Sequence, residues 1–166
     1  MAKNHEIFTS LCRHLRFSQD YTGTQTDFET TCNQLGLSRL PRAFENYWNA
    51  DVVYGPPGFV MFRPAKDVDE LVALNLQMRN QEGLRHELIV FAKSGDDAWW
   101  LMDLSSNPNG PVYSCDAAFP VNIDSESPYA NSFNEFLVKY GHYLVRSGME
   151  SLAWFQSQLE LAGKSQ

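Results

Sequence analysis

Three apolar segments separated by two tight turns constrain the fold of this chain more than any other feature. Residues 88–92 and 99–104 have the length and apolar composition of buried strands, and the turn-forming sequence at 94–97 between them is typical of a hairpin. A second turn at 107–110 leads into a third strand over 112–117. Because turns this short join antiparallel neighbours, these segments predict an antiparallel sheet.

Helical patterns lie on both sides of these strands. Apolar residues recur at helical spacing near the start of the chain, and the capping boxes Thr26-x-x-Glu29 and Asp67-x-x-Glu70 predict the first turns of two more helices. Glycines that follow the apolar spacing predict where these two helices end. The predicted helices cover 5–17, 26–35, 40–48, 67–82, 132–146 and 147–161.

Two further short strands are predicted before the hairpin, at 52–54 and 59–62. The segment 55–58 between them is Gly-Pro-Pro-Gly, which predicts a turn. This order of elements favours an α+β fold, in which an antiparallel sheet of hairpin-connected strands is flanked by N- and C-terminal helices. The length of 166 residues fits a single domain over 1–166.

The formal net charge of −7 lies wholly in the middle of the chain. Residues 49–130 hold five basic and twelve acidic residues, whereas the two flanking stretches are balanced. This distribution disfavours direct binding of nucleic acid, which needs a basic stripe facing the phosphates. The acidic excess can serve solubility alone, or it can form a negative face that attracts a basic protein partner, and both interpretations stay open.

The sequence contains no recognisable catalytic, metal-binding or cofactor-binding motif. Cys12, Cys32 and Cys115 are far apart and form no C-x-x-C, so we expect buried thiols in a reducing compartment. The four histidines form neither H-E-x-x-H nor a helical i, i+4 pair, which makes a metal site unattractive. Neither a nucleophile elbow nor a phosphate-binding glycine loop is present. We therefore expect no enzymatic activity, no cofactor and no metal.

The chain also carries no recognisable signal for export or membrane insertion. Its first residues lack the apolar core of a signal peptide, and no apolar run approaches the length of a membrane span. We therefore expect a cytoplasmic protein with no membrane partner. The charge excess further predicts a monomer or a weak homodimer.

Asp103 is the acidic residue with the most unusual sequence surroundings. It alternates with Trp99 and Leu101 on one face of the strand predicted at 99–104. A carboxylate on so apolar a strand needs a partner such as a backbone N–H or an arginine. We interpret Asp103 as a hydrogen-bonding anchor. A catalytic acid that acts with a histidine such as His86 is the alternative.

The adjacent tryptophans point to a binding surface. Because neighbouring residues of a strand face opposite sides, either the sheet is covered on both faces or one of Trp99 and Trp100 is exposed. An exposed aromatic residue beside acids is typical of a protein-binding anchor. We predict a partner-binding face built by 51–63 and 94–116. Its candidate residues are Tyr54, Asp96, Asp97, Trp99 and Asp116.

A series of short motifs occurs in an order that is typical of one protein family. The motifs are Phe28-Glu29, Leu35-Gly36, Leu40-Pro41, Phe44 with Trp48, 100–103, 110–113, Ser132-Phe133 and Phe136-Leu137. In this order the chain resembles the SUKH superfamily, bacterial immunity proteins related to a fungal regulator of cell-wall glucan synthesis. The resemblance covers about 26–140. It departs from the family at 49–51, where Asn-Ala-Asp stands in place of a frequent Asn-Gly.

The resemblance implies an α+β fold and a non-enzymatic role in binding a protein partner. In bacteria that role is usually the neutralisation of a cognate toxin, and the acidic middle segment is compatible with a basic nuclease toxin. The alternative is an intracellular scaffold or regulator that binds a cellular enzyme or a peptide. A gene for a toxin beside the gene for this chain would favour the first interpretation.

Overall fold

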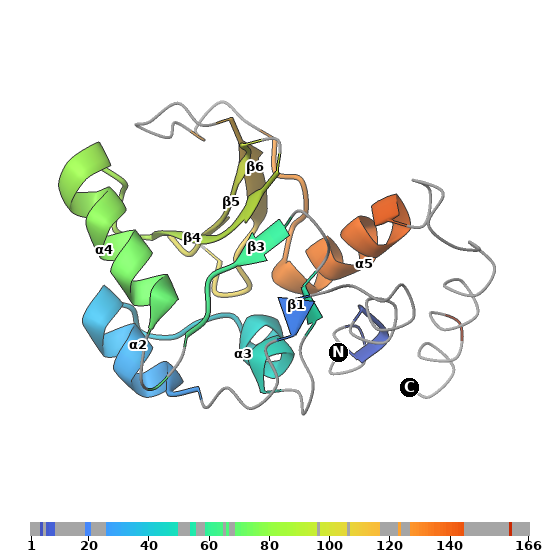
Figure 1. Ribbon diagram of the computed structural model, residues 1–166, viewed down its shortest axis with the longest axis horizontal. Coiled ribbons are helices and arrows are strands. Elements are labelled where there is room, and N and C mark those ends of the chain that lie inside the picture. Colours follow the sequence, from blue (N-terminus) through green and yellow to red (C-terminus); the bar gives the residue numbers. More distant parts are fainter. Residues whose placement is uncertain are drawn as a thin grey trace.

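The computed structural model describes residues 4, 6–8, 19–20, 26–49, 54–55, 59–64, 66, 69–95, 97–105, 107–116, 123, 127–144 and 160. Among these residues the helices are α2 (Phe28–Leu35), α3 (Arg42–Trp48), α4 (Glu70–Glu82) and α5 (Phe133–Leu144). The strands are β1 (Gln19–Asp20), β2 (Tyr54–Gly55), β3 (Phe59–Met61), β4 (Leu88–Ser94), β5 (Trp99–Asp103) and β6 (Val112–Cys115). Figure 1 shows how these elements are arranged.

The strands form an antiparallel sheet in the order β3-β4-β5-β6, as the hairpin pattern predicts. The backbone N–H of Asp97 donates to the carbonyl of Ser94 at 3.0 Å in the first turn. In the second turn, Gly110 donates to Asn107 at 2.9 Å. Helices before and after this sheet complete the predicted α+β fold.

A β-bulge in β4 decides which side chains face which layer. Val90 pairs with Leu101, but the next pair on the ladder is Ala92 with Trp100. The extra residue places Phe91 and Ala92 on the same face of the sheet, where both belong to one core cluster. The bulge also places Lys93 on the opposite face, beside its cross-strand partner Trp99.

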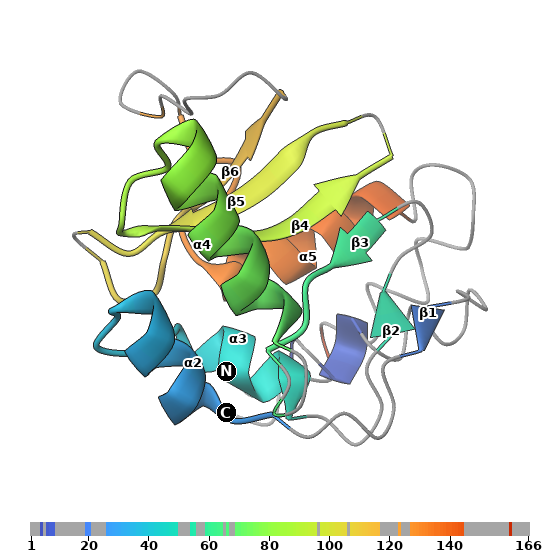
Figure 2. The ribbon, with the colours of Figure 1, turned by 60° about the vertical axis from the view of Figure 1, so that its left-hand side comes forward.

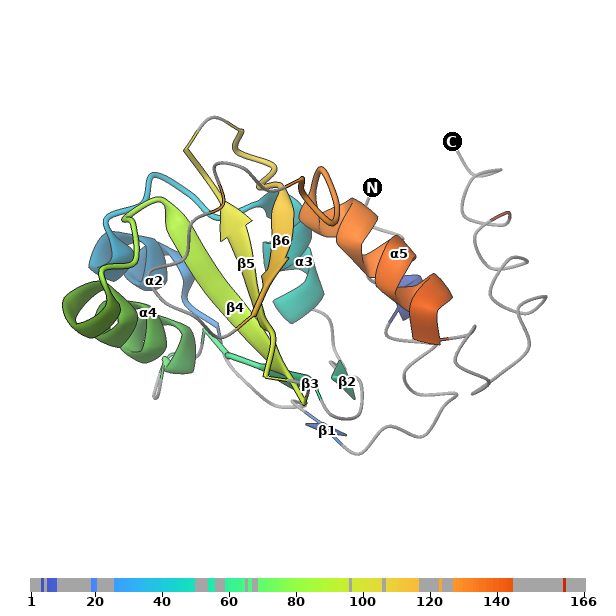
Figure 3. The same cartoon turned by 90° about the horizontal axis from the view of Figure 1, so that it is seen from above.

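Helices cover both faces of the sheet. Figures 2 and 3 show α4 across one face and α5 behind the other, with α3 on the same side as α5. The α5 side is filled with aromatic rings in edge-to-face contact, including Phe133 with Phe44 at 5.0 Å and with Phe91 at 5.4 Å between ring centroids. The cluster on the α4 side is smaller and consists of Met78, Leu84, Leu88, Val90, Leu101 and Ile123.

Asn75 in the middle of α4 completes the open side of β4. Strand β3 pairs only with the second half of β4, so the N–H and C=O of Val90 have no strand neighbour on that side. Asn75 is fully buried and bonds both groups: its Oδ1 accepts from the N–H of Val90, and its Nδ2 donates to the carbonyl, each at 2.8 Å. The same Nδ2 also donates to the carbonyl of Leu71 at 2.8 Å. A helix side chain thus replaces a strand at this edge.

Two predicted helix starts are wrong by a small number of residues. The N-cap of α2 is Asp27, whose carboxylate accepts from the N–H of Thr30, and not Thr26. The N-cap of α4 is Asp69, which accepts from the N–H of Val72, and not Asp67 as predicted. Both predicted ends are confirmed, because Gly36 and Gly83 adopt the left-handed conformation at the C-caps.

The prediction for 51–58 is also corrected. Gly55 belongs to a strand and not to the turn, because it pairs with Gln19 while Tyr54 pairs with Asp20. The polar sequence of β1 gave no strand signal. Three predicted segments lie wholly or largely outside the described residues: the rest of this turn, the helix over 5–17 and the helix over 147–161. Within the described part of the chain, no helix is long and apolar enough to cross a membrane.

Candidate protein-docking face

Four side chains form a row across all the strands of the main sheet, on the face that α4 partly covers. Val60 pairs with Lys93, Lys93 with Trp99, and Trp99 with Cys115. Directly paired residues project to the same face, so the row is continuous. The fully buried cluster beneath α4 includes the neighbouring pair Val90 and Leu101 but no residue of this row. Val60, at one end of the row, has 47% of its surface exposed. We call this row, with Phe62, Asp97 and Asp116, the docking face.

Trp99 is held in a defined position at the centre of the docking face. Its ring lies nearly parallel to that of Phe62, with an interplanar angle of 22° and 6.3 Å between the centroids. The ammonium group of Lys93 lies 5.1 Å from the centroid of the Trp99 ring, within the range of a cation–π contact. The ring is half-buried. An aromatic side chain restrained in this way loses little conformational entropy when a partner covers it.

Charged residues surround the tryptophan. The Nζ of Lys93 lies 2.8 Å from Oδ1 of Asp97, whose side chain is 76% exposed. Asp97 adopts a positive φ of 65° in the turn between β4 and β5, a conformation that aspartate tolerates better than most residues. Asp116 follows β6 and is also exposed. An apolar centre with a charged rim is the usual composition of a protein–protein interface.

The structure places two of the five residues predicted to bind a partner, Trp99 and Asp97, around Lys93, and a third, Asp116, at the end of β6. Trp99 and Asp97 lie at one end of the β4–β5 hairpin, and Asp116 directly follows Cys115, the partner of Trp99 in the ladder. The side chains of Tyr54 and Asp96 lie outside the described residues. Trp100 faces the other side of the sheet, where it is 7% exposed and contacts Phe136. The sheet is therefore covered on both faces, and Trp99 is the more exposed tryptophan.

Sequence reasoning missed Lys93, and it included Val60 only within the range 51–63 and not among the candidate residues. Lys93 follows five apolar residues of β4, and that apolar run does not show that Lys93 meets Trp99 across the hairpin. The bulge between Val90 and Ala92 sets this register, and a continuous apolar run conceals a bulge. The short turn between the two strands was the available signal, because it placed the first residue of β5 opposite the last residues of β4.

Asp103 acts as the hydrogen-bonding anchor that its sequence surroundings predict. Its Oδ1 accepts from the backbone N–H of Ser105 at 2.9 Å and so orders the start of the second turn. Among the described residues no hydrogen bond joins Asp103 to a histidine, and the ring of His86 packs instead against Gly36. No group of histidine, cysteine and acidic residues in this part of the chain could hold a metal ion.

Two comparisons with known proteins complete this description. Residues 16–139 match the sequence model of the SMI1 / KNR4 family (SUKH-1). The match ends close to the boundary predicted from the motifs, near 140, and begins about ten residues before the predicted boundary near 26. A comparison with curated proteins found no match.

Proposed function

The chain belongs to the SMI1 / KNR4 family (SUKH-1), and we propose that it works by binding another protein through the docking face around Trp99. Members of this family generally bind proteins and do not catalyse reactions. The observation that carries the proposal is Trp99, which Phe62 and Lys93 restrain and which is only half-buried at the edge of the cluster beneath α4. Restrained tryptophans with a charged rim are frequent hot spots of protein–protein interfaces.

The partner that fits this surface best is a basic toxin domain, which the chain would neutralise as an immunity protein. The net charge of −7 is concentrated in 49–130, the segment that supplies the docking face. Asp97 and Asp116 stand exposed on the rim, where a basic partner would meet them first. Charges at a rim mainly accelerate association, whereas a buried aromatic anchor mainly slows dissociation.

Co-expression with the toxin encoded beside this gene tests the proposal. Cells that carry both proteins should survive, and the two should co-purify as a complex. Death of the co-expressing cells without a recoverable complex would reject the role in immunity. A gene neighbourhood without a toxin, together with capture of a cellular enzyme, would instead support the scaffold interpretation.

Variants of Trp99 then test the surface itself. Trp99→Ala should dissociate from the partner faster, whereas Tyr143→Ala should leave the complex unchanged. Tyr143 is a suitable control because it is an aromatic residue with 58% exposure on α5, which lies on the other side of the sheet. If folded Trp99→Ala protein binds as tightly as the unaltered chain, the docking face lies elsewhere.

A further inference from the structure

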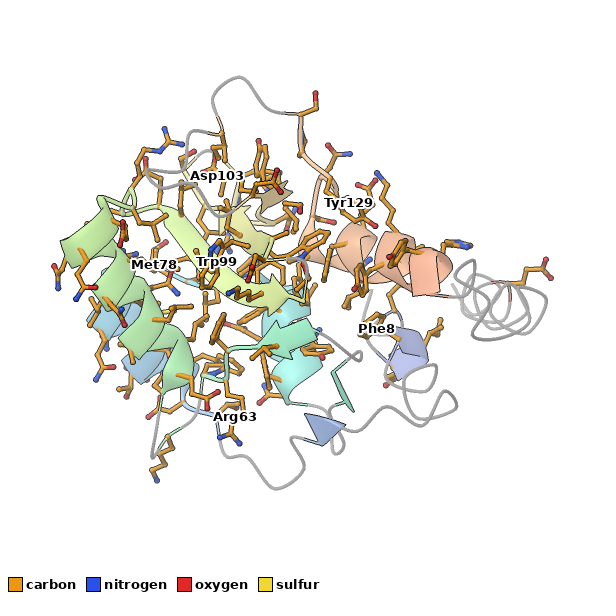
Figure 4. The ribbon with its side chains drawn as sticks, turned by 45° about the horizontal axis from the view of Figure 1, so that its top comes forward. Phe8, Arg63, Met78, Trp99, Asp103 and Tyr129 are labelled. Carbon is orange, nitrogen blue, oxygen red and sulfur yellow. The ribbon has the colours of Figure 1, made fainter. Side chains whose placement is uncertain are left out.

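A polar cleft lies at the other end of the β5–β6 hairpin from the docking face. It has a volume of about 590 Å³ and is formed by the loop 36–39 between α2 and α3, by Glu87 before β4, and by the turn after β5. Asp103, labelled in Figure 4, directly precedes this turn, and Trp99 is labelled at the other end of the same strand. A cleft of this size falls within the range of ligand-binding pockets.

The walls of the cleft are fixed by contacts within the protein. On one side, Nη1 of Arg79 donates to the carbonyl of Leu35 at 2.8 Å and its Nη2 donates to the carbonyl of His86, which ties the end of α2 to the start of β4. On the other side, Gly110 has a φ of 62°, and a Cβ there would lie 2.9 Å from the Leu104 side chain and 3.2 Å from that of Pro41. The two walls are thus packed together at their base, and the cleft exists before any ligand arrives.

Two opposite charges line this cleft without neutralising each other. Arg39 is exposed and Glu87 is half-buried. Within the described part of the chain, neither side chain forms a close ion pair or a hydrogen bond, although Glu87 interacts at longer range with the charge of Arg79, and Arg39 with that of Glu45. A ligand that carries only negative charge would meet Glu87, and one that carries only positive charge would meet Arg39. The cleft therefore favours a ligand with both charges.

The remaining lining matches a polypeptide. Ser38, Ser105 and Asn107 offer hydroxyl and amide groups that can bond to backbone N–H and C=O groups. Leu37 and Leu104 add apolar contact area. We infer that this cleft binds an extended polypeptide segment in which an acidic side chain pairs with Arg39 and a basic side chain pairs with Glu87. This site is separate from the proposed docking face, since four residues of β5 span about 14 Å.

Short peptides test this inference directly. The probes are capped heptapeptides of Ser and Ala that carry one Glu and one Arg at varied separations, together with matched peptides that carry two Glu or two Arg residues. Amide chemical shifts of the full-length protein report both affinity and location. The unaltered chain should prefer the mixed-charge peptides, with shifts in 36–39, 87 and 104–108.

Charge reversal in the cleft should change this preference in a defined way. Arg39→Glu leaves two acids in the cleft, so it should bind mixed-charge peptides about fivefold more weakly and prefer the peptides with two Arg residues. Glu87→Arg should prefer the peptides with two Glu residues, and the double reversal should recover the mixed-charge preference. If Glu87→Arg lowers the melting temperature, Glu87→Gln replaces it as the test variant. Glu87→Gln should weaken binding of the mixed-charge peptides without creating a preference for two Glu residues.

Three results would overturn the inference. The first is the absence of mixed-charge binding at millimolar peptide, and the second is a charge preference that the reversals leave unaltered. The third is loss of peptide binding in a folded Trp99→Ala variant, because it would place the peptide on the docking face. The cleft inference and the proposed function can therefore fail separately: co-expression tests the toxin partner, and these peptides test the cleft.

Discussion

Replacement of Asn75 by alanine should destabilise the fold more than its small size suggests. The substitution leaves the N–H and C=O of Val90 buried without partners, because Asn75 is the side chain that bonds both. A buried backbone group left without a hydrogen bond costs about 1–3 kcal/mol. Alanine regains about 0.5 kcal/mol of helix propensity. The expected loss in free energy of unfolding is therefore about 2–5 kcal/mol, from the sum of two such groups less that gain.

Urea denaturation followed by circular dichroism measures this loss, and Asn80→Ala is the matched control. Asn80 lies on the same helix but is exposed, so the same substitution there should be neutral or slightly stabilising. Amide hydrogen exchange supplies a local measurement, since the amide of Val90 should lose protection in Asn75→Ala. A loss below about 1 kcal/mol, with Val90 still protected, would refute the view that Asn75 replaces a missing strand.

Four other predictions concern charge, the docking face and the packing around α4. Reversal of Asp96 and Asp97 to lysine should slow association with a basic partner and weaken its dependence on salt in stopped-flow kinetics. Asp97→Asn keeps the positive-φ turn and isolates the effect of charge. Trp99→Ala should weaken binding by about thirtyfold, or about 2 kcal/mol, in calorimetry. The melting temperature of the Trp99→Ala variant shows how much Trp99 also contributes to stability, since Phe62 and Lys93 contact its ring. Burial raises the pKa of Asp69 above its ordinary 3.8, so its charged form opposes folding as pH rises above about 4. Asp69→Asn keeps a side-chain cap for α4, so its stability relative to the unaltered chain should increase over that pH range; a constant difference in urea titrations would contradict this. Arg79→Met should lower the free energy of unfolding by about 2 kcal/mol, because two backbone carbonyls lose a charged donor; an unchanged urea midpoint would contradict it.

The sequence predicted the elements well because their signals are local. The hairpin strands, the two turns and the helix ends at Gly36 and Gly83 follow from residues that are neighbours in the chain. The helix starts were harder, since adjacent residues can both cap a helix. Tertiary contacts decide between them: the hydroxyl of Thr26 donates to Asn49, which leaves Asp27 as the cap of α2.

The candidate site was predictable only in part, because its geometry depends on register. Alternation along β5 showed that Trp99 and Trp100 face opposite sides, but not which face was more fully covered. The answer came from α5, whose Phe136 and Tyr140 pack on Trp100. The position of Lys93 depended on a bulge that a continuous apolar run does not reveal. Asn75 gave no signal for a similar reason, because its partner lies fifteen residues away in β4.

Strand β5 connects the two proposed binding sites of this small sheet. Its central residues, Leu101 and Met102, are fully buried on opposite faces, so the middle of the strand is fixed by the core. Its ends emerge from the core, one into the docking face and the other into the turn that lines the cleft. A rigid strand holds both surfaces at a constant separation but offers no second arrangement through which one could switch the other. If both proposals hold, we expect two partners to bind together, each with an affinity that does not depend on the other.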